Sequence, residues 1–413
     1  MVRVYSSAVH LIVIMKRAAT AIAFAWRAVL RRPIGRGSWL AALLLVAGSS
    51  AFALLAVVGA EKGARWLAPD YLVETRGLHV FSETLGWKPR AGASAVIGGK
   101  RVTINTRGYR GRELSFPKAR TTARLVVLGD SIAFGLGVSD RETFVSLIDV
   151  RDNGIEAANL AVQGYGPGQE LLVLLGEGLR TDPDTVVLAF CLDNDFADAV
   201  LAVSLYDGRT PKPRVRLDGD RLVVERSSLR RTDAQRVVQW LADYSLLFNR
   251  LSTLRPRPEP SAGLHWTDLK HEALRDEEYA LRLTLAIVRR MDAVCRERGI
   301  AFVLAAFPHW FTYRSKPWLA RRFLDSLQAE GITVLDMSAR FVARGETFRA
   351  VALDGGGHLS PLGHAITAEE LESVIAALLR RSVSASPNRP HDRGPRLSGR
   401  TALRSPRSGV GAP

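Results

Sequence analysis

The chain has 413 residues, of which 47% are hydrophobic and 24% are charged. These fractions are typical of folded proteins and exclude wholesale disorder, collagen-like repeats and a polytopic membrane protein. The formal net charge is +16, but most of it lies at the two ends: residues 1–36 contribute +7 and residues 386–413 contribute +5. Only +4 remains for the part between them. A nucleic-acid-binding groove needs its positive charge on the folded part, so no nucleic-acid partner is expected.

The chain contains only two cysteines, Cys191 and Cys295, which are far apart. Neither belongs to a CxxC pair or a His-rich segment, so the sequence predicts neither a disulfide framework nor a zinc site. No His/Asp cluster has the spacing of metal ligands. We therefore expect no metal and no cofactor.

An uncharged apolar segment follows the basic amino terminus. Residues 38–60 contain no charged side chain, and their apolar run of about 22 residues is long enough to cross the roughly 30 Å hydrocarbon layer. The positive-inside rule places the basic segment 1–37 in the cytoplasm and the residues after Glu61 outside it, in the periplasm or at the cell surface. We predict an uncleaved single-pass anchor that contacts membrane lipid. A signal peptide cleaved after Ala60 is the alternative, and Met15 is an alternative start of the chain.

The remaining residues divide into three regions. Residues 61–120 show short strands and turns that lead from the membrane to a folded domain at 121–382, which carries an insertion at about 205–265. The tail, residues 383–413, is rich in Ser, Pro, Arg and Gly and has almost no large apolar residue. It is therefore predicted to be disordered.

Short β-branched segments alternate with longer amphipathic segments in the folded domain. Strands are predicted at 125–128, 157–161, 185–190, 301–307 and 333–337. Helices are predicted at 143–152, 168–179, 271–298, 316–330 and 362–379. This alternation implies βαβ crossovers and predicts an α/β, doubly wound, flavodoxin-like fold with a five-stranded parallel sheet in three α/β/α layers. The insertion is expected to form a hairpin turning at Asp218-Gly219, followed by a helix, and to lie over or beside the strand ends.

Polar and small residues follow three of the predicted strands. Ser131 comes directly after the first strand, where its hydroxyl is exposed at the edge of the sheet and its own N–H is free. Gly164, after the second strand, has an N–H that can face a negative oxygen. Asn194, after the third, has an amide that can donate to the same oxygen while Asp195 holds the loop. The alternatives are an ordinary helix N-cap at Ser131 and plain turns at the other two positions.

A glycine-rich segment, Asp354-Gly-Gly-Gly-His358, precedes the last predicted helix. A general-base histidine needs a carboxylate on Nδ1 while its Nε2 takes the serine proton. The glycine-rich turn allows Asp354 to fold back onto His358. The other seven histidines, including His309 and His364, are expected to be surface residues.

The order of these segments resembles the SGNH/GDSL hydrolase superfamily over roughly residues 85–382. The resemblance implies that Ser131 is the nucleophile, that His358 is the general base and that Asp354 orients it. It also implies an oxyanion hole formed by the Ser131 N–H, Gly164 and Asn194. Two features depart from the family pattern. Leu192 occupies the position of a family glycine, and three residues rather than two separate Asp354 from His358.

The mechanism implied by the resemblance is acyl transfer through a covalent acyl-serine. We predict a membrane-anchored extracytoplasmic serine esterase that hydrolyses small O-acyl esters, with an acylated carbohydrate of the cell envelope or another small ester as substrate. An O-acyltransferase that modifies an envelope polysaccharide and a catalytically inactive envelope scaffold are the alternatives. Aromatic residues in or near the insertion are candidates either for stacking on sugar rings or for the core: Trp240, Tyr244, Trp266 and Trp310. The sequence does not indicate the oligomeric state.

Overall fold

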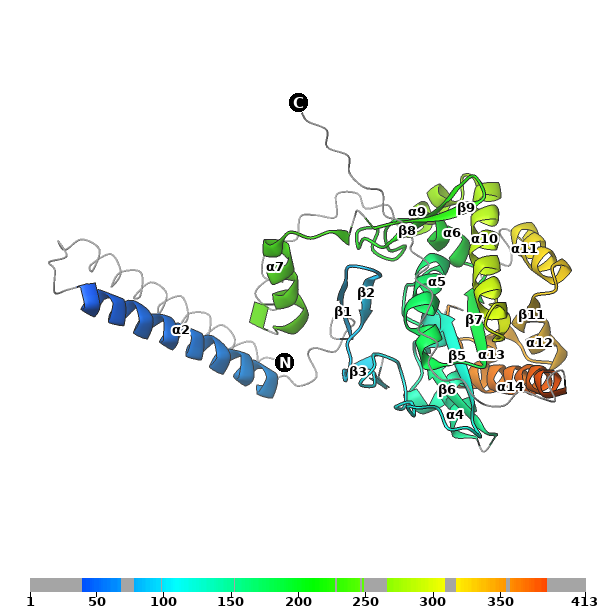
Figure 1. Ribbon diagram of the computed structural model, residues 1–413, viewed down its shortest axis with the longest axis horizontal. Helices are drawn as coiled ribbons and strands as arrows, with labels where there is room; N and C mark the ends of the chain where they lie inside the picture. The colour runs from blue at the N-terminus through cyan, green and yellow to red at the C-terminus, as the bar shows by residue number, and fades with distance from the viewer. Residues whose placement is uncertain are drawn as a thin grey trace, which may run out of the picture.

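The computed structural model describes residues 39–67, 78–97, 99–151, 153–226, 229–245, 247–248, 266–308, 317–353 and 357–384 (Figure 1). The predicted basic segment 1–37 and all of the predicted tail after residue 384 lie outside these ranges. So do three single residues considered above, Asp354, His309 and Trp310.

A five-stranded parallel sheet forms the centre of the folded domain. Its strands are β5 (Ala123–Gly129), β6 (Ile155–Asn159), β7 (Thr185–Cys191), β10 (Ala301–Phe307) and β11 (Thr333–Asp336). Their order in space is β6-β5-β7-β10-β11, which is 2-1-3-4-5 when the strands are counted along the chain. This is the flavodoxin-like doubly wound order, so the predicted fold class is confirmed. The binding crevice of such a sheet lies at the carboxyl ends of the strands, where the strand order reverses, here between β5 and β7.

Helices cover both faces of this sheet (Figure 1). One face packs against α5 (Pro167–Gly176), α6 (Asp195–Val200), α10 (Glu277–Arg296) and α11 (Pro317–Ala329). The other packs against α3 (Ser131–Phe134), α4 (Phe144–Val150), α12 (Met337–Ala343), α13 (Phe348–Val351) and α14 (Pro361–Ser384). Side chains alternate along β5, with Val126 and Leu128 in the first core and Leu125 and Val127 in the second. Because both faces of the central strands are covered, these strands consist of almost continuous apolar residues.

Two helices differ from the sequence prediction. The single helix expected at 271–298 is two helices, α9 (Trp266–Ala273) and α10. The break lies at Asp276, whose carboxylate accepts a hydrogen bond from the Tyr279 N–H at 2.8 Å and caps α10. The last helix, α14, continues to Ser384 instead of ending at residue 379.

The segments outside the central domain form small antiparallel units. The lead-in contains two hairpins, β1 (His79–Ser82) with β2 (Gly86–Pro89) and β3 (Ser94–Ile97) with β4 (Lys100–Thr103). The insertion contains β8 (Arg214–Asp218), β9 (Arg221–Glu225) and α7 (Asp233–Tyr244). The β8–β9 hairpin turns after Asp218, as predicted, and Gly219 there has φ +59°, a conformation that favours glycine.

Among the described residues, one helix is long and apolar enough to cross a membrane. This helix, α2 (Trp39–Leu67), includes the 21-residue apolar segment Leu43–Gly63. Its apolar side chains are exposed: Leu44, Phe52, Leu54 and Leu55 each keep about two thirds of their surface accessible. The helix extends away from the α/β domain (Figure 1). The predicted segment 38–60 therefore forms a helix from Trp39 onward, and this helix continues past residue 60.

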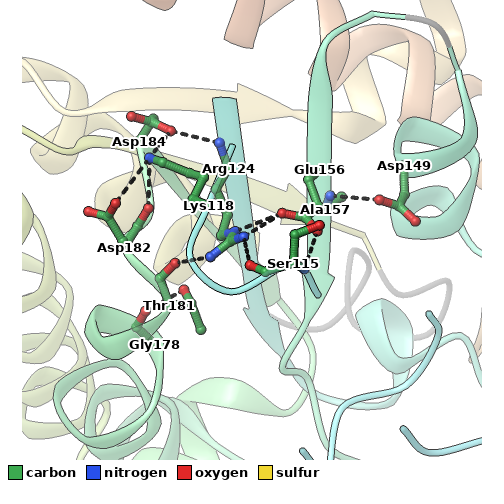
Figure 2. Close-up of polar contacts among 10 residues, drawn as sticks. All are labelled: Ser115, Lys118, Arg124, Asp149, Glu156, Ala157, Gly178, Thr181, Asp182 and Asp184. Carbon is green, nitrogen blue, oxygen red and sulfur yellow. Dashed lines mark hydrogen bonds and ion pairs between the residues drawn. The ribbon is translucent and has the colours of Figure 1, made fainter. Parts of the chain in front are cut away.

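An ion-pair network ties the amino-terminal ends of three strands together (Figure 2). Arg124, fully buried at the start of β5, donates to Glu156 of β6 and to the Thr181 carbonyl. The Asp184 carboxylate before β7 accepts from the Arg124 backbone N–H at 2.7 Å and from Lys118 Nζ at 2.6 Å. These contacts fix the edge of the sheet opposite to the strand ends that carry Ser131.

Candidate active site

Ser131 lies at the carboxyl end of β5, as the first residue of the short helix α3. The chain turns sharply here because Gly129 has φ +150°, and a Cβ at this position would lie 2.9 Å from the Ala189 carbonyl oxygen. The Asp130 carboxylate caps α3 by accepting a hydrogen bond from the Ile132 N–H at 2.8 Å. The turn thus places the Ser131 hydroxyl at the binding edge of the sheet.

His358 is brought to this serine from the other end of the domain. Its Nε2 lies 3.0 Å from Ser131 Oγ, although the two residues are separated by 227 positions. The histidine segment is held against α13 because the Leu353 N–H donates to the His358 carbonyl and the Ser360 N–H donates to the Val351 carbonyl. The expected partner of His358, Asp354, lies outside the described residues, so its pairing stays a prediction.

Gly164 follows β6 in a conformation with φ +75°. Within the described part of the chain, the backbone N–H groups of Ser131 and Gly164 donate to no protein acceptor. Two aromatic rings flank this glycine: a Cβ on it would lie 3.4 Å from the Tyr206 ring and 3.5 Å from the Trp87 ring. The Trp87 Nε1–H donates to the Gln163 carbonyl at 3.0 Å, which fixes the indole beside the turn.

The Asn194 side chain lies among carboxylates. Its Nδ2 is 3.1 Å from Asp130, 3.2 Å from Asp195 and 3.3 Å from Asp198. Because an amide has only two N–H groups, donation to a substrate oxygen requires one of them to leave a carboxylate. Asp195 Oδ2 accepts from the Cys191 N–H at 2.7 Å and so holds the loop as expected.

Leu192, at a position where the resemblance implied a glycine, is accommodated in the core. Its side chain is buried and belongs to the cluster that includes Phe190 and Phe196. Its N–H donates to the Phe307 carbonyl at 3.0 Å, which joins the ends of β7 and β10. The branched side chain therefore stabilises the loop that carries Asn194.

The carboxylates around Asn194 form a buried acidic cluster: Asp130, Glu170, Asp195 and Asp198. Burial raises the pKa of Asp130 to about 6, against the opposing hydrogen bonds from Ile132 and Asn194. Burial, together with the charges of Asp130 and Asp198, also raises the pKa of Glu170 well above its ordinary value. Both Glu170 carboxyl oxygens lack a hydrogen-bond partner among the described residues. Burial without a hydrogen-bond partner therefore favours the neutral form of Glu170 over the charged form.

Lys212 supplies the buried positive charge beside this acidic cluster. Its Nζ donates to Asp198 Oδ1 at 2.6 Å and to the Asp198 carbonyl at 2.9 Å, and both side chains are almost fully buried. Despite this ion pair, burial raises the pKa of Asp198. Among the described residues, no group of three His, Cys, Asp or Glu side chains is arranged to hold a metal ion. The cluster is thus a network of carboxylates, amide and ammonium.

Arg110, which the sequence analysis did not single out, holds the turn that follows Ser131. Its buried guanidinium donates to the carbonyls of Phe134, Gly135 and Val138, which follow Ser131 directly, at 2.6–2.8 Å. It also pairs with Asp140 at 2.9 Å. Burial lowers the pKa of Arg110. The one hint in the sequence was the position of Arg110 in the segment Gly108-Tyr109-Arg110 of the lead-in. A buried arginine needs several hydrogen-bond acceptors, but the sequence does not show that Arg110 is buried.

His364 was expected at the surface, and this expectation was wrong. Its side chain is completely buried at the start of α14, and its Nδ1 accepts a hydrogen bond from the Phe144 N–H at 3.2 Å. Burial lowers its pKa to about 3, and the nearby positive charge of Arg110 acts in the same direction. The imidazole also stacks on the Phe144 ring with centroids 5.7 Å apart. His364 is therefore a neutral core residue.

The aromatic candidates for sugar stacking lie on elements of the insertion and on α9. Trp240 and Tyr244 are on α7, with their ring centroids 6.0 Å apart. Trp266 begins α9, where Lys270 Nζ lies 5.9 Å from its ring. The aromatic side chains that flank Gly164 are instead Trp87 and Tyr206, which the sequence analysis did not select.

No protein-family model and no curated protein matches the chain. Solved structures are similar to it at low identity. A member of the lipolytic G-D-S-L family from Veillonella parvula is 11% identical over 62% of this chain and 99% of its own, with a TM-score of 0.36. A GDSL-like lipase from Bacteroides thetaiotaomicron is 12% identical over 64% of this chain and 92% of its own, with a TM-score of 0.35. A catalytic mutant of an acetylxylan esterase from Geobacillus stearothermophilus is 13% identical over 62% of this chain and 96% of its own, with a TM-score of 0.34.

Proposed function

We propose that the protein is a serine esterase that hydrolyses small O-acyl esters through an acyl-serine intermediate. The observation that carries this proposal is the 3.0 Å contact between Ser131 Oγ and His358 Nε2 at the carboxyl edge of the sheet. A serine hydroxyl becomes a nucleophile when an adjacent imidazole can take its proton. The backbone N–H groups of Ser131 and Gly164, which have no acceptor among the described residues, belong to the same edge.

The reaction follows from these groups in two halves. Ser131 Oγ attacks the ester carbonyl carbon while His358 Nε2 accepts the hydroxyl proton, and the negative oxygen of the tetrahedral intermediate accepts hydrogen bonds from the Ser131 and Gly164 N–H groups. The C–O bond to the alcohol then breaks, and His358 returns the proton to the leaving alcohol. In the second half His358 deprotonates water, which attacks the acyl carbon. The bond from that carbon to Ser131 Oγ then breaks, His358 returns the proton to Ser131 Oγ, and the carboxylic acid leaves.

In this proposal Asn194 assists the oxyanion and Asp354 orients His358. One Asn194 N–H turns from its carboxylate partners to the substrate oxygen as negative charge develops there. Without substrate, the carboxylates of Asp130 and Asp198 hold the amide in place by accepting from its N–H groups. Asp354 accepts from His358 Nδ1–H and thereby fixes the tautomer that leaves Nε2 free to act as base.

The surroundings of the site favour a small acyl group on a carbohydrate. The hollow lined by Ile132, Phe341 and His358 has a volume of about 10 Å³ and holds about one water molecule, so it offers no room for a long acyl chain. Trp87 and Tyr206 beside Gly164 provide flat apolar rings, which pack well against sugar rings. We place the domain outside the cytoplasmic membrane, with α2 as its anchor, because the basic residues precede α2 and the catalytic domain follows it.

The decisive experiment compares the full-length protein with Ser131→Ala and with a matched serine variant, Ser326→Ala on α11. Hydrolysis of p-nitrophenyl acetate and labelling by a serine-directed phosphonate are measured on each. We expect activity and labelling in the wild type and Ser326→Ala, and neither in Ser131→Ala. Labelling without hydrolysis would favour the acyltransferase, and a folded wild type that shows neither would refute the enzyme.

A further inference from the structure

Helix α7 of the insertion carries an exposed apolar face. Val237, Trp240, Leu241 and Tyr244 recur at the spacing that places side chains on one side of a helix, with Val238 beside them. The exposed fractions are 59% for Val237, 54% for Val238, 59% for Trp240 and 43% for Tyr244. Single exposed apolar residues need no explanation, but a continuous group on one helix indicates a surface that meets an apolar partner.

The end of α7 is tied to the apolar helix α2. Glu61 Oε2 accepts hydrogen bonds from the Ser245 hydroxyl and from the Leu247 N–H, each at 2.9 Å. Ser245 is the residue that directly follows α7. In Figure 1, α7 lies near the carboxyl-terminal part of α2 and apart from the central sheet.

The position of Glu61 along α2 defines the depth of this contact. The apolar segment Leu43–Gly63 spans about 31 Å at a rise of ~1.5 Å per residue, close to the thickness of the hydrocarbon layer. Glu61 is two residues from the end of this segment, so its carboxylate lies at the boundary between hydrocarbon and water when α2 spans a membrane. Tyr244 and Trp240 are within about one and a half helical turns of Ser245 and are of the residue types enriched at that boundary.

We propose that the apolar face of α7, formed by Val237, Val238, Trp240 and Tyr244, lies in the interfacial layer of the outer leaflet and contacts lipid. This inference rests on the anchoring of α2 stated in the proposed function. Lipid is the occupant because the hydrogen bonds to Glu61 hold α7 at the end of the membrane span, where lipid is the apolar phase. An amphipathic helix in this layer adds a second attachment and fixes the orientation of the catalytic domain relative to the membrane.

The test uses nitroxide labels on the full-length protein in lipid nanodiscs. Val238→Cys carries the label on the α7 face, and Val342→Cys is the matched control because this exposed valine lies on α12 of the catalytic domain. Leu54→Cys on α2 reports the anchor itself. The native Cys191 and Cys295 are buried and so are expected to remain unlabelled. Collision rates with oxygen, which concentrates in lipid, and with a water-soluble nickel chelate are measured for each label.

We expect the labels at positions 54 and 238 to collide more with oxygen than with the nickel chelate, and the label at 342 to show the reverse. A label at 238 that behaves like the one at 342, while position 54 reports lipid, overturns the α7 proposal and leaves the anchor in place. A label at 238 that is shielded from both reagents indicates a protein partner and also overturns it. If position 54 reports water, the anchoring in the proposed function fails, and this inference fails with it.

Discussion

Each side chain at the proposed site has a separate physical role. In the proposed reaction Ser131 supplies the nucleophile and His358 the proton acceptor, and the two lie at a hydrogen-bonding distance of 3.0 Å. The Arg110 guanidinium donates hydrogen bonds to three carbonyls of the turn after Ser131. Such a residue acts by holding the backbone in place, and a small displacement of that backbone lowers the rate steeply.

Tyr206 is expected to contribute to carbohydrate binding through its ring. Tyr206→Ala removes the surface beside Gly164 and is expected to raise the KM for an acetylated oligosaccharide about tenfold, equivalent to about 1.4 kcal/mol. Tyr206→Phe keeps the ring and is the matched control, with a KM within about twofold of wild type if stacking dominates. Steady-state kinetics measure both. Equal KM values for Tyr206→Ala and wild type would exclude Tyr206 from the sugar site.

His364 is expected to make the stability of the fold depend on pH. Its pKa is about 3 in the folded state and about 6.5 when unfolded, so the unfolded chain binds more protons between these values. The contribution is fully present above pH 6.5 and is lost as the pH falls toward 3. Between pH 7 and pH 5 the free energy of unfolding should fall by about 2 kcal/mol more in the wild type than in His364→Asn, which keeps an acceptor for the Phe144 N–H but does not titrate.

This difference is measured by urea unfolding of both proteins across the pH range. Other groups titrate in both, so only the difference between the two curves reports His364. Parallel curves for wild type and His364→Asn would show that the buried imidazole does not control acid stability.

At the scale of elements, the start of α14 positions the histidine segment. The Val351 carbonyl accepts from the Ser360 N–H, and a Cβ at Gly363 would lie only 2.2 Å from that carbonyl oxygen. The helix therefore approaches α13 as closely as the backbone permits. The same contact fixes the loop from which His358 reaches Ser131.

Gly363→Ala is expected to push α14 away from α13 and shift His358. Overpacking of this kind costs roughly 1–3 kcal/mol of stability, and a displacement of about 1 Å at the base lowers kcat by about 100-fold. Gly176→Ala on α5 is the matched control, because a Cβ there meets no atom within 4 Å. It should leave kcat unchanged and stability equal or slightly higher. Calorimetry and ester hydrolysis test both, and equal kcat values in the two variants would contradict the proposed positioning.

The central strands were predictable because their burial on both faces requires continuous apolar residues. Val186 to Phe190 and Phe302 to Phe307 are of this type, and they pair in register. The boundary between α9 and α10 was not predicted, because the amphipathic pattern continues across it and only the cap at Asp276 marks the break. The strand order depends on contacts between distant segments, and it was inferred from the βαβ alternation and the family resemblance.

The site was predictable only in part, because it too depends on contacts between segments that are distant in the sequence. Ser131 and His358 stand next to recognisable turns, so their order along the chain suggested that they meet. Glu170 and Lys212 lie in segments where charged residues are usually solvated, and nothing local distinguishes them from surface residues. Their burial results from the packing of α5, α6 and the insertion around one another. The role of Asp354 stays a prediction.

At the scale of the whole molecule, the two edges of the sheet formed by the carboxyl and amino ends of its strands carry different kinds of residue. The carboxyl edge carries Ser131, Gly164 and Asn194, whereas the amino edge carries the ion pairs of Arg124, Glu156 and Asp184 (Figure 2). The central strands β7 and β10 between them are buried on both faces. Substitutions at the amino edge are therefore expected to lower the stability of the fold without changing kcat.

Arg124→Leu tests this expectation. The side chain of Arg124 is fully buried and that of Glu156 is 11% exposed, so removal of the arginine leaves a carboxylate with no guanidinium partner and should cost about 3–5 kcal/mol. The matched variant Arg289→Leu breaks an exposed pair with Glu330 and should cost at most about 1 kcal/mol. Under conditions where both variants are fully folded, their kcat should equal that of the wild type, because the amino edge does not touch the site. A lower kcat in folded Arg124→Leu alone would show instead that the network at one edge of the sheet controls the geometry at the other.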